Sequence, residues 1–250
     1  MTDRKAALVT GGARRIGRAI ALALSRAGYT VAIQANRSVA EAESLRDEIV
    51  RGGGRAAVLR ADLAEHASVA GLVAAAAEAV GPLSLLVNNA AMFEPDAVGA
   101  LDVVRFDRQF AVNLRAPLFL SESFAAQAGE GASIVNILDQ RVFKLTPQFV
   151  SYTLAKSALY SATRMLAQAL APKVRVNAVA PGPTMSSARQ AADDFARQAA
   201  AVPLGHGPTP EEVAAAVVYL ASARSVTGAT LVIDGGQHLA WQTPDAITKE

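Results

Sequence analysis

The chain has 250 residues, a formal net charge of +2 and a composition that is 52% hydrophobic, 5% aromatic and free of cysteine. A chain of this length can bury a sufficient core without disulfides, and the absence of cysteine excludes thiolate metal sites, iron–sulfur clusters and a cysteine nucleophile. Three histidines argue against a histidine-rich metal site, so no metal is expected. The small net charge argues against a nucleic-acid-binding protein, and the apolar content excludes a disordered chain.

The apolar stretches are too short for a targeting or membrane segment. Ala6–Val9 breaks at a glycine turn, well short of a signal-peptide core. No run approaches the roughly 18 apolar residues of a membrane span. We therefore expect a cytoplasmic protein with no membrane partner.

Short apolar runs alternate with longer alanine-rich amphipathic stretches along the whole chain. In chain order we predict strand 6–10, helix 18–27, strand 30–35, helix 39–51, strand 55–60, helix 65–80, strand 83–87, a helical region over about 100–128, strand 133–138, helix 151–170, strand 174–179, helix 210–221 and strand 231–234. Continuous apolar strands that alternate with helices are typical of a parallel sheet buried on both faces. The sequence thus predicts an α/β fold with one domain over 1–250, a Rossmann-type doubly wound parallel sheet with helices on both faces. The segment 182–210 lacks a strong period and is expected to be a substrate-binding loop.

A glycine-rich turn joins the first strand to the first helix. It reads Thr10-Gly11-Gly12-Ala13-Arg14-Arg15-Ile16-Gly17. Glycine lets the backbone approach a pyrophosphate closely, and the N-terminus of the following helix offers free N–H groups. The spacing is not G-x-G-x-x-G, and such a turn can be a mere connection. Its place after the first strand favours nucleotide binding, so we expect Gly11, Arg14, Arg15, Ile16 and Gly17 to contact a cofactor.

The end of the second strand selects that cofactor. An NAD site places an acid there to hold the ribose 2′-hydroxyl, but this chain has no acid until Glu41. Asn36, Arg37 and Ser38 stand there instead, and an arginine can bind a 2′-phosphate through charge-assisted hydrogen bonds. We therefore predict NADPH, and reduction as the working direction. The alternative is that Arg37 is one more solvated charge.

Tyr152 and Lys156 are four residues apart and so share one face of a predicted helix. An ammonium near a phenol eases proton transfer from it, and a tyrosine so placed can act as a general acid when hydride reaches a neighbouring atom. Such a pair is more often a surface pair. Its place after the fifth strand of a nucleotide-binding sheet favours a catalytic role.

Together with Asn88-Asn89-Ala90, Asn113 and Pro181-Gly182, these motifs follow one another in an order that resembles the short-chain dehydrogenase/reductase family over essentially the whole chain. The resemblance implies a sheet of seven parallel strands and a homotetramer. It further implies a cofactor contact at each of these positions: Asp62 and Leu63 near the adenine, Asn88 and Ala90 along the cofactor, Pro181 and Gly182 near the nicotinamide, and Lys156 on its ribose. Asn113 would support a water that leads to Lys156.

Two residues depart from the family pattern. Arg15 replaces the central glycine of the turn, and Asp139 replaces a serine found 13 residues before the tyrosine in many members. In having both replacements, the chain resembles one branch of the family: the pteridine reductases and the related dihydromonapterin reductases, also called alternative dihydrofolate reductases. In that branch the equivalent of Arg15 reaches the phosphates and the pterin, and an aromatic at the position of Phe93 stacks on the pterin. Phe149 and Met185 are further candidates for pocket walls by position.

The chemistry of Asp139 favours the same branch. An ionised carboxylate only accepts hydrogen bonds, so it suits a substrate that brings donors, such as a pterin amino group, and repels a developing alkoxide. Its charge also keeps Tyr152 protonated. We therefore expect reduction of a C=N bond in a pterin or dihydrofolate ring. The alternatives are a carbonyl reductase acting on a 3-oxoacyl or other ketone, and a cofactor sensor without catalysis.

Overall fold

A seven-stranded parallel sheet lies at the centre of the computed structural model, which describes residues 5–186 and 191–242. The strands are β1 (Ala6–Val9), β2 (Thr30–Ala35), β3 (Ala56–Arg60), β4 (Leu83–Asn88), β5 (Ala132–Ile137), β6 (Val174–Pro181) and β7 (Thr230–Ile233). Their order is β3-β2-β1-β4-β5-β6-β7, and every neighbouring pair is parallel. The order changes direction between β1 and β4, and ligands of doubly wound sheets bind at the carboxyl edge beside such a point. The predicted fold class is confirmed.

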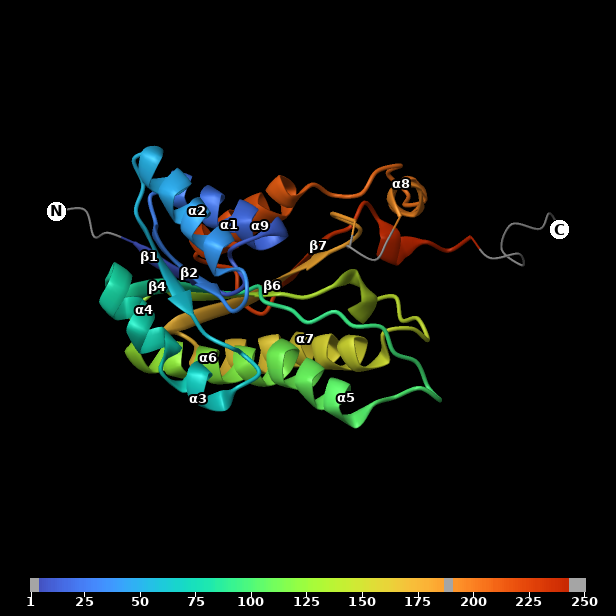
Figure 1. Ribbon diagram of the computed structural model, residues 1–250, viewed down its shortest axis with the longest axis horizontal. Coiled ribbons are helices and arrows are strands. Elements are labelled where there is room, and N and C mark those ends of the chain that lie inside the picture. Colours follow the sequence, from blue (N-terminus) through green and yellow to red (C-terminus); the bar gives the residue numbers. More distant parts are fainter. Residues whose placement is uncertain (1–4, 187–190, 243–250) are drawn as a thin grey trace.

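Helices cover both faces of the sheet (Figure 1). On one face lie α1 (Arg15–Arg26), α2 (Val39–Arg51) and α9 (Pro210–Ser222). On the other lie α4 (Leu72–Val80), α6 (Ala116–Gln127) and α7 (Val150–Leu170). Successive side chains of a strand point to opposite faces, so the two layers are covered by alternate residues of the same strand. In β1, Ala7 and Val9 join the first core, whereas Ala6 and Leu8 join the second, all at 1% exposure or less.

The prediction of a single helix over 65–80 is wrong, because this segment forms two helices, α3 (His66–Ala70) and α4. They join at Gly71, a residue type that weakens a helix interior by about 1 kcal/mol relative to alanine. The region predicted over 100–128 is likewise divided, into α5 (Val103–Phe110), a π-helical turn (Ala111–Arg115) and α6. Pro117 has no N–H to donate to the carbonyl of Asn113, so the regular ladder is interrupted where the π turn lies.

Two further boundaries differ from the predictions. The first helix begins at Arg15 rather than at residue 18, so it includes part of the glycine turn. The segment predicted as a loop over 182–210 contains α8 (Ala192–Ala200), and residues 187–190 of that segment lie outside the described residues. None of the residues of α8 is buried, and its nine residues are too short a run for a helical period to stand out in the sequence.

The helices vary in length, and α7, with 21 residues, is the longest in the described part of the chain. No helix within residues 5–186 and 191–242 is long and apolar enough to span a membrane.

Candidate active site

The glycine turn is pressed against the segment that follows β4. Gly11 has a φ of +59°, which favours glycine, and a Cβ there would lie 2.8 Å from Ala90 Cα. At Gly17 a Cβ would lie 2.2 Å from the carbonyl oxygen of Gly11. Asn89 Nδ2 donates to the carbonyls of Thr10 (2.9 Å) and Gly11 (3.0 Å) and so fixes the turn. Both glycines are therefore required by close backbone approach.

The N-terminus of α1 is left free for an anion. Arg14 is the N-cap and makes no side-chain cap, and the first turn carries no acid. The first N–H groups and the positive end of the helix dipole therefore lack a negative partner from α1 itself. Ile16 packs on the core beneath the helix, while the exposed side chain of Arg14 pairs with Glu41 at 3.3 Å.

Arg15 adopts a left-handed backbone with a φ of +55°, at the position where the family pattern has glycine. A bulky residue in this region costs of order 1–3 kcal/mol and persists only where its surroundings hold it. The guanidinium donates to the carbonyls of Ser186 (2.7 Å) and Met185 (3.0 Å). Arg15 thus connects the glycine turn to the segment after β6, and Met185 itself is exposed.

The end of β2 presents Asn36, Arg37 and Ser38 at the same edge, with Arg37 exposed. A residue of β2 that the sequence did not single out supports the turn. Gln34 is 2% exposed, its Oε1 accepts from Gly11 N (2.8 Å) and its Nε2 donates to Ala61 O (2.8 Å). The signal was available, since Gln34 is the one polar residue among the buried residues of β2.

The predicted adenine and mid-cofactor residues lie along the same edge. Asp62 accepts from Ala64 N (3.0 Å) and lies 3.7 Å from the guanidinium of Arg108. Leu63 is buried in the core. Asn88 is buried too, and its Nδ2 donates to Asn136 Oδ1 (2.9 Å), so its amide ties β4 to β5.

Pro181 ends β6, and Gly182 donates from its N–H to Ile233 O at 2.9 Å. A Cβ at Gly182 would lie 2.6 Å from Asp234 Cβ, so glycine is required there for contact with the end of β7. Asp234 is buried and accepts from the backbone N–H groups of Gly236 and His238 and from His238 Nδ1. Asp234 therefore fixes the chain beyond β7.

Tyr152, Lys156 and Asp139 meet at the carboxyl end of β5. The Tyr152 hydroxyl donates to Asp139 Oδ2 at 3.0 Å, and Lys156 Nζ donates to Ile137 O at 2.7 Å. Tyr152 and Lys156 are buried on one face of α7. Asp139 also accepts from the backbone N–H of Arg141 at 2.9 Å, which begins a short 3-10 turn and orients the carboxylate.

Burial and the carboxylate shift the pKa values of all three groups. Burial raises the pKa of the Tyr152 phenol well above its usual value, and the Asp139 charge and hydrogen bond raise it further. Burial also raises the pKa of Asp139, and the hydrogen bonds that the carboxylate accepts from Arg141 N and Tyr152 lower it by less. Burial lowers the pKa of Lys156 to about 8, although Asp139 opposes that shift. The phenol therefore stays protonated at neutral pH while Lys156 is mostly charged.

Asn113 lies in the π-helical turn and is buried. Its Oδ1 accepts from Met92 N (3.0 Å) and its Nδ2 donates to Met92 O (2.8 Å). The amide predicted to support a water is thus engaged with the backbone next to Phe93, and it fixes that segment.

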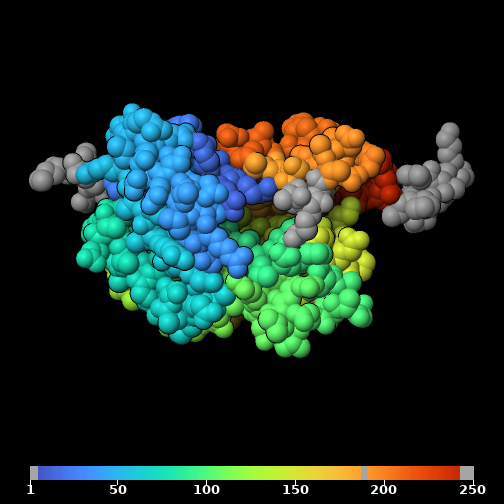
Figure 2. Space-filling model, viewed as in Figure 1, coloured from blue at the N-terminus to red at the C-terminus, as the bar shows by residue number. Residues whose placement is uncertain are grey.

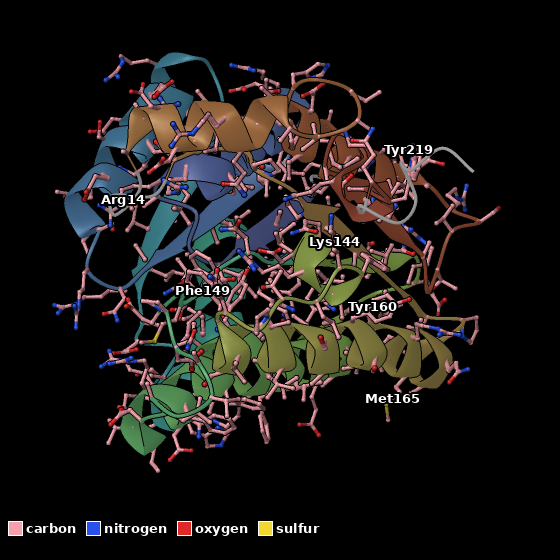
Figure 3. The ribbon with its side chains drawn as sticks, turned by 90° about the vertical axis from the view of Figure 1, so that its right-hand side faces the viewer. Arg14, Lys144, Phe149, Tyr160, Met165 and Tyr219 are labelled. Carbon is pink, nitrogen blue, oxygen red and sulfur yellow. The ribbon has the colours of Figure 1, made fainter. Side chains whose placement is uncertain are left out.

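Two aromatic rings lie beside the phenol. Phe93 and Phe149 are stacked, with ring centroids 4.2 Å apart and planes 6° from parallel. The Phe93 ring also meets the Tyr152 ring edge to face at 4.7 Å. The guanidinium of Arg141 lies 5.0 Å from the Phe149 ring. Figure 3 shows the carboxyl edge of the sheet, with Phe149 on one side of it and Arg14 on the other.

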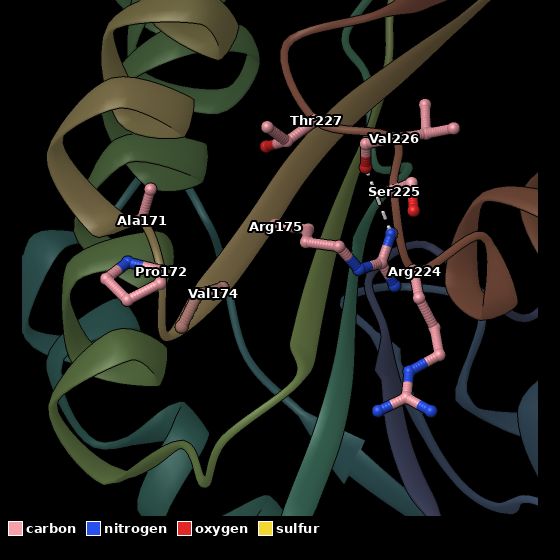
Figure 4. A pocket seen from close by; sticks show the side chains of 8 residues that line it. All are labelled: Ala171, Pro172, Val174, Arg175, Arg224, Ser225, Val226 and Thr227. Atoms are coloured by element: carbon pink, nitrogen blue, oxygen red, sulfur yellow. Dashed lines mark hydrogen bonds between the residues drawn. The ribbon is translucent and has the colours of Figure 1, made fainter.

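A cavity lies at the opposite edge of the sheet from these residues, at the amino ends of β6 and β7 (Figure 4). It has a volume of about 220 Å³ and is lined by Ala171, Pro172, Val174, Arg175, Arg224, Ser225, Val226 and Thr227. The Arg175 guanidinium donates to the carbonyls of Leu220, Ala221 and Val226. Arg175 therefore caps the C-terminus of α9 and is engaged structurally. Among the described residues, no cluster of three or more His, Asp or Glu side chains is placed to hold a metal.

Comparison with known proteins gives a consistent result. A family model described as enoyl-(acyl carrier protein) reductase matches residues 11–238. The FolM alternative dihydrofolate reductase 1 of Brucella canis, solved in complex with NADP, is 51% identical, with a TM-score of 0.94 and 98% of each chain covered. A short chain dehydrogenase of Burkholderia cenocepacia, also in complex with NADP, is 35% identical with a TM-score of 0.87, over 93% of this chain and 97% of that one. The L-rhamnose 1-dehydrogenase (NAD(P)(+)) of a Sphingomonas species is 33% identical over 97% of this chain and 99% of its own. Because the family model covers residues 11–238 and these relatives are 33–51% identical over nearly their whole length, this chain belongs to the short-chain dehydrogenase/reductase family of oxidoreductases.

Proposed function

We propose that this protein is an NADPH-dependent reductase that transfers hydride to a C=N bond of a pterin or dihydrofolate ring. The observation that carries the proposal is the hydrogen bond from the Tyr152 hydroxyl to Asp139 beside the Phe93 ring. It combines a proton donor, an acceptor-only carboxylate and an apolar flat surface within one site. The 51% identity to the Brucella FolM protein supports the same substrate class.

The residues present fit NADPH. The N-terminus of α1 has no side-chain cap and no acid in its first turn, so its N–H groups suit a phosphate. The exposed Arg37 follows β2, where an acid would select NAD. Arg14, Arg15 and the α1 N–H groups would hold the pyrophosphate, Arg37 and Ser38 the 2′-phosphate, and Lys156 the nicotinamide ribose. When bound, NADPH supplies the hydride.

Tyr152 supplies the proton. Its raised pKa keeps the hydroxyl protonated, and the hydrogen bond to Asp139 holds the phenol oxygen in place until the O–H turns to the substrate nitrogen. The ring carbon of the C=N bond gains the hydride, and the adjacent nitrogen gains the Tyr152 proton. Lys156 is charged below about pH 8 and stabilises the phenolate that remains. General acid catalysis of this kind contributes roughly 10²–10⁴ in rate.

Phe93, Phe149 and Asp139 define the substrate. A conjugated ring packs on the Phe93 face through dispersion and stacking. The Asp139 carboxylate accepts a hydrogen bond from the substrate, so it favours an amino group or a protonated ring nitrogen. Arg15 and Met185, joined by a hydrogen bond of 3.0 Å, form the opposite side of the site.

The alternative function is reduction of a ketone, or the reverse oxidation of a sugar, and the L-rhamnose 1-dehydrogenase relative favours it. NADPH oxidation measured with dihydropterin, dihydrofolate and a panel of ketones separates the two. The proposal predicts turnover of the reduced pteridines, and Asp139→Ser should weaken it while improving ketone turnover. Ketone turnover without pteridine turnover would overturn the proposal. Binding of NADPH without turnover would identify a cofactor sensor, although a sensor has no need of the buried Tyr152/Lys156 pair.

The assembly we propose is a homotetramer. Large apolar side chains are exposed on the helices of one face, including Val103 and Val104 on α5, Phe119 on α6, and Leu154 and Met165 on α7. Figure 2 shows α5 at the surface, and Figure 3 shows Met165 pointing away from the sheet. Exposed apolar groups of this size mark a protein contact. Light scattering after gel filtration should give four times the 25.9 kDa chain mass, and a monomer would contradict the proposal.

A further inference from the structure

One buried carboxylate links the segment that carries Phe93 to the start of α7. Asp96 is 8% exposed, and its two oxygens accept from Ser151 N at 3.2 and 3.3 Å. The Ser151 hydroxyl donates to Asp96 Oδ2 as well. The backbone carbonyl of Asp96 accepts from Phe149 N at 2.8 Å. Four hydrogen-bond contacts thus join two segments that are 55 residues apart in the sequence.

Asp96 provides the cap that α7 lacks. The N-cap of α7 is Phe149, whose side chain cannot accept a hydrogen bond, and no acid lies in the first turn. A helix N-terminus is stabilised by a side-chain oxygen that accepts from its first N–H groups, and a negative charge there interacts favourably with the helix dipole. Asp96 supplies both from another part of the chain.

This contact determines where two site residues stand. Phe149 has a φ of +56°, a strained conformation for a bulky residue, and its backbone N–H is held by Asp96. The next residue after Ser151 is Tyr152, whose hydroxyl lies 3.0 Å from Asp139. On the other side, Phe93 lies between Asp96 and Met92, which Asn113 fixes.

We propose that Asp96 is a positioning residue that holds the Phe93–Phe149 stack and Tyr152 in register with each other. Asp96 touches neither reacting atom. Its carboxylate acts through Ser151, whereas its backbone carbonyl holds Phe149 N; loss of the carboxylate therefore removes three of the four contacts and lets the first turn of α7 move relative to the Phe93 segment. The effect on turnover rests on the function proposed above, whereas the effect on the backbone does not.

The test compares Asp96→Ala and Asp96→Asn with Asp102→Ala, each in the full chain. Asp102 is a matched control because it caps α5, with its Oδ1 accepting from Arg105 N at 2.8 Å, and is exposed outside the site. Three quantities are measured: NADPH-dependent reduction of 7,8-dihydrofolate, amide hydrogen exchange without substrate, and the Kd for NADPH. Dissociation of NADPH is followed by its fluorescence.

Asp96→Ala should lower kcat/KM by about 100-fold, since a displacement of about 1 Å at a reacting group has that effect. Its Kd for NADPH should change less than twofold, and exchange should quicken at least tenfold in both 149–153 and 91–95. Asp96→Asn can still accept from Ser151 N and donate to its hydroxyl, so it should retain most of the activity. Asp102→Ala should quicken exchange only near 103–106 and leave turnover unchanged.

Two results would overturn the proposal: unchanged exchange at 149–153 in Asp96→Ala, or faster exchange there with wild-type kcat/KM. A wild type that reduces no pteridine would refute the proposed function alone, and the exchange data would then decide the role of Asp96. If Asp96→Ala does not fold, Ser151→Ala, which removes only the hydroxyl contact, should reproduce the same pattern to a smaller degree. Wild-type exchange and turnover in Ser151→Ala would then refute the positioning role.

Discussion

Replacing Lys156 with methionine should stabilise the folded protein while it abolishes turnover. Lys156 is 1% exposed, and burial lowers its pKa from 10.5 to about 8. Each pKa unit corresponds to about 1.4 kcal/mol of difference between the two protonation states. The charged ammonium therefore costs about 3 kcal/mol of folding free energy at pH 7, a value that already includes its attraction to Asp139.

Methionine is of similar length and removes this cost. It also removes the hydrogen bond from Lys156 Nζ to Ile137 O, worth about 1 kcal/mol, so the net gain at pH 7 should be about 2 kcal/mol. The gain depends on pH. Between about pH 8 and 10.5 the folded protein has released the Lys156 proton and the unfolded chain still holds it, so wild-type stability rises with pH in this window. The advantage of the variant should shrink by about 2 kcal/mol between pH 7 and 9.5.

Urea unfolding of both proteins without cofactor, at pH 7 and pH 9.5, measures these values. The matched control is Lys173→Met, because Lys173 Nζ also donates to a backbone carbonyl, Ala125 O at 3.2 Å, but from outside the site. This control should keep the wild-type rise of stability with pH. A Lys156→Met protein that is less stable than wild type at pH 7, or whose advantage is the same at both pH values, would refute the argument.

Three further outcomes are expected. Turnover should fall about tenfold per pH unit above about pH 8, as Lys156 loses its charge and while Tyr152 stays protonated; a flat profile of kcat/KM from pH 6 to 10 would contradict the role of Lys156. Arg37→Gln should weaken NADPH binding roughly 10- to 100-fold, the usual value of a hydrogen-bonded charge contact, and leave NADH binding unchanged; equal losses for both cofactors would argue against a 2′-phosphate site. Arg15→Gly should change the free energy of unfolding by less than about 1 kcal/mol, because relief of the strain at φ +55° compensates for the freer unfolded chain. The same variant should raise the KM for the pteridine, and an unchanged KM would remove Arg15 from the substrate site.

Much of the fold follows from local patterns. The strands are short apolar runs buried on both faces, and such runs between amphipathic helices leave few alternatives to a parallel sheet. The exceptions have local causes. Gly71 divides one predicted helix, and Pro117 interrupts the hydrogen-bond ladder of another. The exposed helix α8 has only nine residues, fewer than the window over which a helical period is recognised, so it was not predicted.

The candidate site was predictable where the residues are close in sequence or carry a distinctive chemistry. Asp139 stands 13 residues before Tyr152, the position from which a contact with the tyrosine was expected, and the two side chains are hydrogen-bonded. Arg37 stands after β2, where an NAD site has an acid, and its side chain is exposed as a phosphate ligand requires. The roles of Gln34 and Asp96 were not predicted. Gln34 stands out as an amide in a buried strand, but each of the two residues acts on a segment far away in the sequence, the glycine turn or the start of α7, so no local pattern identifies its partner.

Backbone strain in the described chain is concentrated at the candidate site. Arg15 and Phe149 are its only non-glycine residues with positive φ, and both lie at the site. Strain of this kind persists only if other contacts hold the backbone, and each residue is held by hydrogen bonds to a distant segment: Arg15 to Met185 and Ser186, Phe149 to Asp96. A protein selected for stability alone would place glycine at such positions and an apolar residue in place of the buried Lys156. The site therefore concentrates the least stable choices of the chain in one place: Lys156→Met should gain stability as it loses activity, and Arg15→Gly should lose affinity for the substrate with little change in stability.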